Sequence, residues 1–430
     1  MATSQQNTLK LDAGGCHIGP PHTIIKRRAT EIQRIHTQLS AGHIFDQSKE
    51  DASLGLEGTL PSFHAYNPKE DLKWVREAIK SLSGRRHLIV VGNGGSITSA
   101  KAYAGALTSD ITFHAVDTID PTYLSQLKKT APPQETAVIA VSKSGNTIGV
   151  IEALLALPNY DGIAITAEPR SPLAAIAKQR GWTTLPQPKN IGGRYSGQTT
   201  AGLVPAALLG ADLKEITKGF ADAYKQNAPK KEAHQNPALT LALYLRLLES
   251  HGLTEIYAPH YGRKLAAFMP LETQLLHESS GKAGRGQTLL AMEAPECQHH
   301  SNQRFFGGPK NMCGLFTVLD SYGGGKLTVP DALKPKTISG KLTFADLNGL
   351  TLTKAIHAEY EGVRQAAKNA GIQHLTVRLE KMDDYHAGYY MGFIHYAYGV
   401  YPALLRNLNP FDQPHVEESK DISRAILSHS

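Results

Sequence analysis

The sequence predicts an α/β protein with two mainly parallel sheets, each flanked by helices in a three-layer arrangement. Short, continuous apolar runs alternate with helical patterns from residue 87 to residue 166, and the same alternation starts again after about residue 230. Such buried strands separated by helices are typical of parallel sheets that are covered on both faces. The chain has 430 residues, which is too long for one ordinary core and favours two domains.

The first half starts from a poorly defined polar segment and then becomes regular. A helix is predicted over residues 70–82, because Leu72, Val75, Ile79 and Leu82 form one apolar stripe. Four apolar runs follow that read as strands, over residues 87–91, 111–116, 136–141 and 161–166. Helices are expected between them, over residues 97–107, 121–129 and 147–157. This order predicts a parallel sheet.

The second half repeats the architecture without a strict repeat of sequence. Strands are predicted over residues 254–258, 311–319 and 372–380, and helices over residues 237–252 and 263–282. A glycine-rich stretch, residues 321–337, is expected to make an excursion between two strands. The aromatic stretch that contains His386 and His395 has helical spacing and is interpreted as core and interface.

Domain boundaries follow from these patterns. We predict an N-terminal segment over residues 1–64, a first domain over residues 65–228, and a second domain with a C-terminal helix over residues 229–430.

Composition limits the class of ligand and the compartment. The net charge of +7 suits an anionic small molecule, and the basic residues form short clusters, so nucleic-acid binding is not favoured. Cys16, Cys297 and Cys313 fit neither a disulfide framework nor a metal motif, which favours a reducing cytoplasm. The N-terminus lacks an apolar signal core, and no run of about 18 apolar residues could span a membrane.

Two glycine- and serine-containing loops follow predicted strands and precede predicted helices. They are "GNGGS" (92–96), with Gly95 and Ser96, and "SKSGNT" (142–147). In an open parallel sheet, ligands bind beyond the carboxyl ends of the strands. The N–H groups and dipole of a helix N-terminus attract anions there. The two loops therefore predict a phosphate site.

The second loop adds its own donors and a flexible backbone position. Ser142, Ser144 and Thr147 supply hydroxyl groups, Lys143 supplies charge, and Gly145 permits a positive φ. The loops match neither the GxxxxGK[ST] nor the GxGxxG pattern, so a phosphate monoester is favoured over a nucleotide. The alternative is a plain strand–turn–helix connection whose Ser and Thr side chains cap the helix.

The loop over residues 142–147 resembles the phosphate loop of sugar isomerase domains. Five further blocks, in the family's order, resemble the glucose-6-phosphate isomerase family, whose fold consists of such domains. The first of these blocks is "VGNGGS" (91–96). The other blocks are "IGGRYS" (191–196), "HESSGK" (277–282), "CQHHSNQ" (297–303) and "NPFDQPHVEESK" (409–420). The resemblance covers roughly residues 85–425 and implies two sugar-isomerase-type domains.

The resemblance also implies a reaction, aldose–ketose isomerisation through an enediolate, and roles for three residues. Glu278 matches the family's catalytic base, and Gln274, four residues earlier on the same helix face, matches its substrate-binding glutamine. Arg194 would stabilise the negative charge of the enediolate. Fixed charges suffice for this chemistry, so no metal or cofactor is expected. Without the resemblance, a solvated Glu278 and a structural Arg194 would be the ordinary interpretations.

Ring opening needs further groups, which the resemblance also suggests. His299 matches the family histidine and would pass protons between the ring oxygen and a hydroxyl, although the adjacent His300 leaves the choice open. Lys420 would act with that histidine, and Gln413 would hold the phosphate. In this family the histidine comes from the neighbouring subunit, which implies a homodimer.

The expected function is the reversible conversion of glucose 6-phosphate to fructose 6-phosphate. Two alternatives remain open at this point. One is an enzyme that also isomerises mannose 6-phosphate, and the other is a sugar-phosphate sensor that binds its ligand without reaction. A sensor would usually carry a DNA-binding helix-turn-helix domain, for which "TEIQRIHTQLS" (30–40) is a poor candidate.

Overall fold

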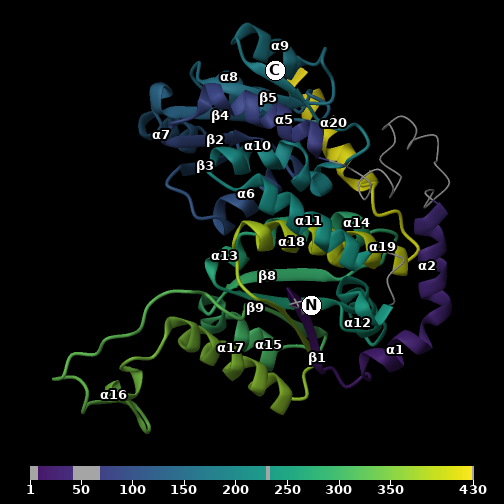
Figure 1. Ribbon diagram of the computed structural model, residues 1–430. Helices are drawn as coiled ribbons and strands as arrows, with labels where there is room; N and C mark the ends of the chain where they lie inside the picture. The colour runs from purple at the N-terminus through teal and green to yellow at the C-terminus, as the bar shows by residue number, and fades with distance from the viewer. Residues whose placement is uncertain (1–7, 42–67, 229–232, 429–430) are drawn as a thin grey trace, which may run out of the picture.

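Two five-stranded sheets form the framework of the molecule, with a layer of helices between them (Figure 1). The computed structural model describes residues 8–41, 68–228 and 233–428. The first sheet has the strand order β3-β2-β4-β5-β6, and every neighbouring pair is parallel. Its strands are β2 (His87–Val91), β3 (Thr112–Val116), β4 (Thr136–Val141), β5 (Asp161–Thr166) and β6 (Thr183–Pro186).

Helices cover both faces of this sheet. On one face, apolar side chains such as Leu124, Val150 and Leu173 pack in a cluster with Ile89 and Val138 of the strands. These helices are α7 (Pro121–Thr130), α8 (Ile148–Ala156) and α9 (Pro172–Gln179). The other face shares the largest core cluster with α5 (Lys69–Ala78), α6 (Gly95–Ala106) and α10 (Thr200–Leu208). The prediction of a parallel sheet between helices is confirmed.

The second sheet has the order β1-β12-β9-β7-β8. Four strands are parallel: β7 (Glu255–Tyr261), β8 (Thr288–Ala294), β9 (Met312–Leu319) and β12 (His374–Leu379). The fifth, β1 (Leu9–Gly15), pairs antiparallel with β12. The sequence pattern did not reveal β1 or β8. Both are edge strands with partly exposed residues. Strand β1 interrupts its apolar residues with polar ones, whereas β8 contains a four-residue apolar run, 289–292, that the sequence analysis did not assign to a strand.

Helices likewise flank the second sheet. Phe305 and Tyr360 pack with Phe316 of β9 on the outer face, where α15 (Ser301–Gly307) and α17 (Leu352–Asn369) lie. Further helices contribute side chains to the core cluster between the two sheets. They are α11 (Leu213–Asn227), α12 (Pro237–Ser250), α13 (Arg263–Ala266), α14 (Met269–Ser280), α18 (Asp384–Ile394), a π-helix (His395–Val400) and α19 (Tyr401–Leu405). The N-terminal helices α1 (Pro21–Arg27) and α2 (Ala29–Ala41) lie on the outer side of α12 and α19 (Figure 1).

The single helix predicted over residues 263–282 is wrong in one respect, because the structure divides it into α13 and α14. Pro270 lies in the first turn of α14, where its missing N–H and fixed φ suit the start of a helix. The same ring disfavours continuation from the preceding helix. The separate helix α14 carries Gln274 and Glu278.

A buried polar network joins α14 to β7 and α18. His260, near the end of β7, forms an ion pair with Glu272 at 2.8 Å between Nε2 and Oε2, and both side chains are fully buried. Tyr390 of α18 donates a hydrogen bond to the other oxygen of Glu272 at 2.7 Å. Burial lowers the pKa of His260, but Glu272 outweighs it and the net direction is upward. Because a buried ion is stable only with its partners, this network fixes α14 against β7 and α18.

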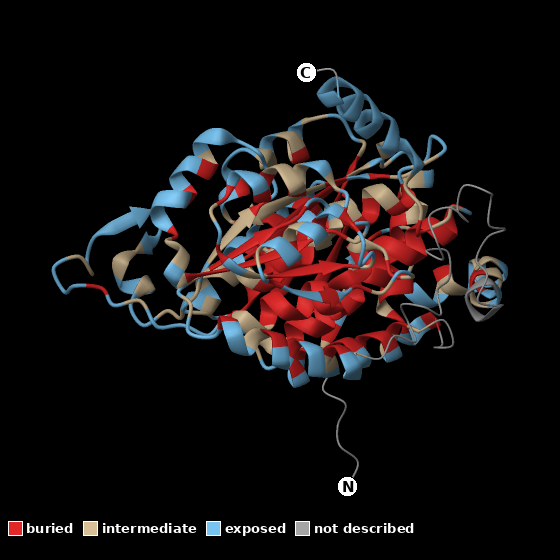
Figure 2. Ribbon diagram, turned by 90° about the horizontal axis from the view of Figure 1, so that it is seen from above, coloured by how far each residue is buried: buried red, intermediate tan, exposed pale blue. Residues whose placement is uncertain are grey.

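Two segments stand away from the core (Figure 2). The glycine-rich stretch leads into an arm that carries β10 (Thr337–Ser339), β11 (Leu342–Thr343) and α16 (Phe344–Leu347), which confirms the expected excursion. Helix α20 (Glu417–Ser428) has no buried residue. Among the described residues, no helix combines the length and apolar character that a membrane crossing needs.

Candidate active site

The two predicted phosphate loops lie side by side at the carboxyl edge of the first sheet. Strands β2 and β4 are neighbours and parallel, so the loops that leave them emerge at the same edge. The side chain of Asn93 lies about 3.5 Å from where a β-carbon on Gly149, in the first turn of α8, would sit. The N-termini of α6 and α8 therefore face one common space.

The second loop is shaped by its own hydrogen bonds. Ser142 is buried, shares a hydrogen bond of 2.8 Å with the Thr147 hydroxyl, and accepts one of 3.1 Å from the N–H of Gly145. Gly145 has φ +67°, and a β-carbon there would meet the Ser171 side chain at 2.0 Å. Only glycine fits this position, which is the role that the sequence predicted for it. Ser144 is exposed and donates to Asn146 at 2.5 Å.

The hydroxyl groups of this site do not cap the helices. Thr147 is the N-cap residue of α8 and Gly94 that of α6, and neither helix has a side-chain cap hydrogen bond. The alternative of a plain turn with capping Ser and Thr side chains therefore does not describe these loops. In the two first turns, the N–H groups of Ser96, Ile97 and Val150 donate to backbone oxygens. The described hydrogen bonds include none from the N–H groups of Gly95, Ile148 and Gly149, which can serve a ligand or water. Gly95 and Ser96 are the first two residues of α6, and Lys143 lies in the loop after β4, so their roles in phosphate binding stay predictions.

Glu278 lies near the end of α14, with both of its carboxylate oxygens held. Gln274 donates from Nε2 to Oε1 of Glu278 at 2.8 Å. Arg194 donates from Nη1 to Oε2, also at 2.8 Å. The amide oxygen of Gln274 accepts at 3.0 Å from Thr98 in the first turns of α6. The carboxylate side chain is 28 % exposed, so it remains accessible to a ligand.

Arg194 is buried and uses all five of its N–H donors. It contacts Ser279 through Nε, and Glu278 and Gln413 through Nη1. Its Nη2 donates to the main-chain oxygens of Pro410 and Asp412, at 2.7 and 3.2 Å. This complete set of acceptors fixes the plane of the guanidinium beside the carboxylate.

The first glycine loop touches the arginine segment directly. A β-carbon on Gly95 would lie 2.3 Å from the backbone nitrogen of Arg194. The close approach of these two backbones requires a glycine. It links the phosphate loops of the first sheet to Arg194, and through Arg194 to Glu278 of the second half.

Gln413 contacts Arg194. Its Oε1 accepts from Arg194 Nη1 at 2.8 Å, so in this structure it belongs to the arginine cluster. The described contacts include none between Gln413 and residues 142–147. Its role in holding the phosphate stays a prediction.

The ring-opening residues are not assembled with Glu278. His299 is exposed at the end of a short 3₁₀ helix (Glu296–His299) that follows β8. His300 is also exposed, 3.3 Å from Glu296 and 2.7 Å from the Ser301 hydroxyl. No described contact joins either histidine to Glu278.

Lys420 also lies outside the cluster. It stands on α20, where it is 57 % exposed and forms an ion pair with Glu417 at 2.7 Å. Its role therefore also stays a prediction. His395 is fully buried, which lowers its pKa to about 3, and His386 is buried against Asp383, in keeping with their interpretation as core residues.

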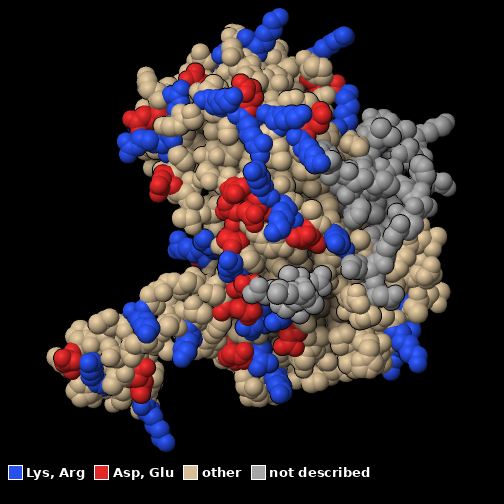
Figure 3. Space-filling view, viewed as in Figure 1, with Lys and Arg blue, Asp and Glu red and all other residues tan. Residues whose placement is uncertain are grey.

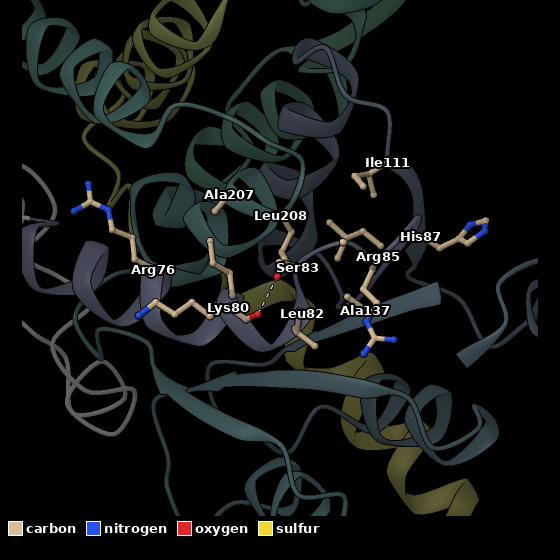
Figure 4. Close-up of a pocket in the computed structure, with 13 residues that line it drawn as sticks. Arg76, Lys80, Leu82, Ser83, Arg85, His87, Ile111, Ala137, Ala207 and Leu208 are labelled. Carbon is tan, nitrogen blue, oxygen red and sulfur yellow. Dashed lines mark hydrogen bonds between the residues drawn. The ribbon is translucent and has the colours of Figure 1, made fainter. Parts of the chain in front are cut away.

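One cavity of the molecule lies away from the candidate active site. A cavity of about 390 Å³ lies near the start of β2, at the opposite edge of the first sheet, and is lined by residues such as Leu82, Arg85 and Ala207 (Figure 4). Arg85 there is already paired with Asp161 at 2.5 Å. Basic side chains are interspersed with acidic ones on the face seen in Figure 3, without a continuous basic tract.

Comparisons with known proteins agree with this geometry. A probable glucose-6-phosphate isomerase from Haloarcula marismortui is 29 % identical over 83 % of this chain and 81 % of its own. A glucose-6-phosphate isomerase from Symbiobacterium thermophilum is 28 % identical over 98 % of this chain and 96 % of its own. The chain is homologous to the glucose-6-phosphate isomerases. No family model matches it.

Solved structures support the same relationship at the level of the fold. A protein from Thermus thermophilus described as hypothetical superposes with a TM-score of 0.84 and 26 % identity, covering 97 % of this chain and 99 % of its own. A glucose-6-phosphate isomerase from Chlamydia trachomatis gives a TM-score of 0.72 at 17 % identity, with 98 % and 89 % coverage. The predicted sugar-isomerase-type α/β fold is confirmed.

Three residues of the cluster were not predicted. Thr98 holds Gln274, Ser279 accepts from Arg194, and Lys282 contacts the segment before Gln413. Ser279 and Lys282 lie in the "HESSGK" block, which was a signal for them, whereas nothing in the local sequence distinguishes Thr98.

Proposed function

We propose that this chain interconverts glucose 6-phosphate and fructose 6-phosphate. The observation that carries the proposal is the contact between Glu278 and Arg194 at 2.8 Å, next to loops built for a phosphate. A phosphate held by the N-termini of α6 and α8 would place the other end of the sugar toward α14, since Gly95 and Arg194 are in direct backbone contact. The similarity to named glucose-6-phosphate isomerases over most of the chain supports the same substrate.

The two charged groups have complementary roles in this reaction. Glu278 removes the proton from C2 of the open-chain aldose and returns it to C1, so no net proton is gained or lost. The electrons of the C2–H bond form the C1–C2 double bond, and the negative charge of the enediolate develops on O1 next to Arg194. The hydroxyl proton of O2 passes to O1, so that protonation at C1 leaves a ketone at C2. Because Arg194 is held by five acceptors before the reaction, little reorganisation is needed when that charge appears.

The direct test is an assay of purified protein on glucose 6-phosphate and mannose 6-phosphate, side by side. We expect fructose 6-phosphate from the first. Formation from both substrates would assign the broader specificity. Binding of both without formation of fructose 6-phosphate would refute the proposed reaction and assign a sensor.

A phosphate-loop substitution should affect binding more than chemistry. We expect Ser144→Ala to raise KM while kcat stays within about threefold, because the hydroxyl would contact only the non-reacting phosphate. Steady-state kinetics measure both constants. The matched control is Ser428→Ala on α20, far along the chain from both loops. A fall in kcat with unchanged KM would contradict the placement of the phosphate at this loop.

We further propose that the protein is a homodimer in which His299 of one subunit completes the active site of the other. We also propose that it acts in a reducing cytoplasm. His299 is exposed at the edge of the second sheet and makes no described contact with Glu278, so a site built from one chain would lack it. The projecting arm, with Ile338 and Leu342 more than 40 % exposed, offers apolar surface for such an assembly. The three cysteines are buried free thiols, in keeping with a reducing compartment.

Mixing two inactive variants tests this shared site. Subunits with Glu278→Gln and subunits with His299→Ala are each expected to form inactive homodimers. A mixed dimer would contain one site with both residues intact, so random exchange should restore about a quarter of wild-type activity. Size-exclusion chromatography with light scattering would show whether dimers form. Dimers that stay inactive after verified exchange would place His299 and Glu278 of each site in the same subunit.

A further inference from the structure

Lys282 follows the end of α14 and reaches across to the segment 409–412. Its ammonium group donates to the main-chain oxygens of Asn409 and Asp412, at 2.5 and 2.9 Å, and to the Asp412 carboxylate. A lysine has three N–H donors, so each has an acceptor in this segment. The side chain is only 9 % exposed.

The same segment holds Arg194 from its other side. The main-chain oxygen of Asp412 accepts from both Lys282 and Arg194, and that of Pro410 accepts from Arg194 and from the Tyr195 hydroxyl. These carbonyl groups are two of the five acceptors that fix the Arg194 guanidinium, so their position contributes to where it lies. Lys282 is the charged side chain that ties them to the end of the helix that carries Glu278.

We propose that Lys282 is a positioning residue for Arg194, an inference that rests on the proposed isomerase function. By fastening residues 409–412 to the end of α14, it keeps the guanidinium and the Glu278 carboxylate in a fixed relation. A displacement of about 1 Å in such a group can lower a rate by roughly 100-fold.

Burial of the Lys282 ammonium favours one position of the segment 409–412. Burial lowers the pKa of Lys282, and the hydrogen bond and charge of Asp412 oppose that effect. An ammonium removed from water is stable only while its acceptors stay in place. The segment 409–412 therefore has one favoured position against the helix end, which is what precise placement of Arg194 needs.

The test compares Lys282→Met with Lys282→Arg in the full chain. We expect Lys282→Met to lower kcat at least about tenfold, with KM changed by less than about threefold, because the phosphate loops lie on the other sheet. Lys282→Arg retains the charge and several donors, so it should recover most of the lost kcat. Lys80→Met, at an exposed lysine paired with Glu77, is the control for loss of a lysine.

A second measurement separates positioning from stability. Hydrogen exchange of the amides in residues 409–413 should be faster in Lys282→Met at a temperature where the protein remains folded. If Lys282→Met does not fold, Asp412→Ala tests the same contact from the segment, with the same split between kcat and KM. A loss of kcat below about fivefold in the folded variant would overturn the inference, as would failure of Lys282→Arg to exceed Lys282→Met. Wild-type protein without isomerase activity would instead refute the proposed function.

Discussion

Glu278→Gln should lower kcat by about 100- to 10,000-fold, the range expected for loss of a general base. The amide has nearly the same size as the carboxylate but cannot accept the C2 proton. Both oxygens of Glu278 accept hydrogen bonds, from Arg194 and Gln274, so the amide can satisfy only one of these donors. Steady-state assays in both directions of the reaction give kcat, and both directions should lose it equally.

The same variant should still bind phosphate. Because the phosphate loops are separate from the carboxylate, we expect inhibition by inorganic phosphate to change by less than about threefold. Glu361→Gln, in an exposed pair with Arg364 on α17, is the matched control and should keep full activity. If Glu278→Gln retains more than about a hundredth of the wild-type rate, the base is another group.

Arg194→Lys should lower kcat by about 100- to 1,000-fold, comparable to the loss of a donor that stabilises a developing oxyanion. A lysine presents three donors around one point, whereas Arg194 places five in a plane on five acceptors. The substitution should also lose about 1–3 kcal/mol of stability for each buried carbonyl left without a donor. Kinetic assays and thermal unfolding, each compared with wild type, measure the two effects.

An inhibitor that mimics the charge of the enediolate makes this second test specific. We expect Arg194→Lys to weaken binding of a phosphorylated sugar acid far more than binding of inorganic phosphate, because only the sugar acid places a carboxylate near Arg194. Arg364→Lys serves as the control, since the hydrogen bond described for the Arg364 side chain is the one to Glu361 on the same helix. Equal weakening of both ligands would show that Arg194 supports the fold or the phosphate loops instead of the reacting end.

Local patterns in the sequence were sufficient for the central strands and the loops that follow them. Strands β2, β4 and β5 begin and end where the apolar runs predicted, because a strand buried on both faces leaves a continuous signal. The positive φ of Gly145 also followed from its neighbours in the loop. Exposed strand β1 and the break before α14 gave weaker signals, since partial exposure and a single proline are compatible with several local structures.

The residues of the candidate site were named from sequence blocks, but their contacts come from packing. Arg194 meets Glu278 across 84 residues and Gln413 across 219, and no local period encodes such pairs. The contacts arise because α14 lies in the helical layer between the sheets, where Thr98 from the first half and residues 409–413 from the C-terminal part can reach it. The contact between Gln413 and Arg194 is an example, since the sequence block named the residue but not this partner.

The sequence by itself determined the α/β class, the places of most central strands along the chain and the chemistry of the side chains at their ends. Only the tertiary structure decided that Lys282 and Arg194 share the carbonyl groups of one segment, and that His299 and Lys420 stand apart from Glu278. The physical reason is the distance along the chain over which each effect acts. Propensity and hydrophobic period act over a few neighbouring residues, whereas the position of a buried charge depends on every distant group that must satisfy it.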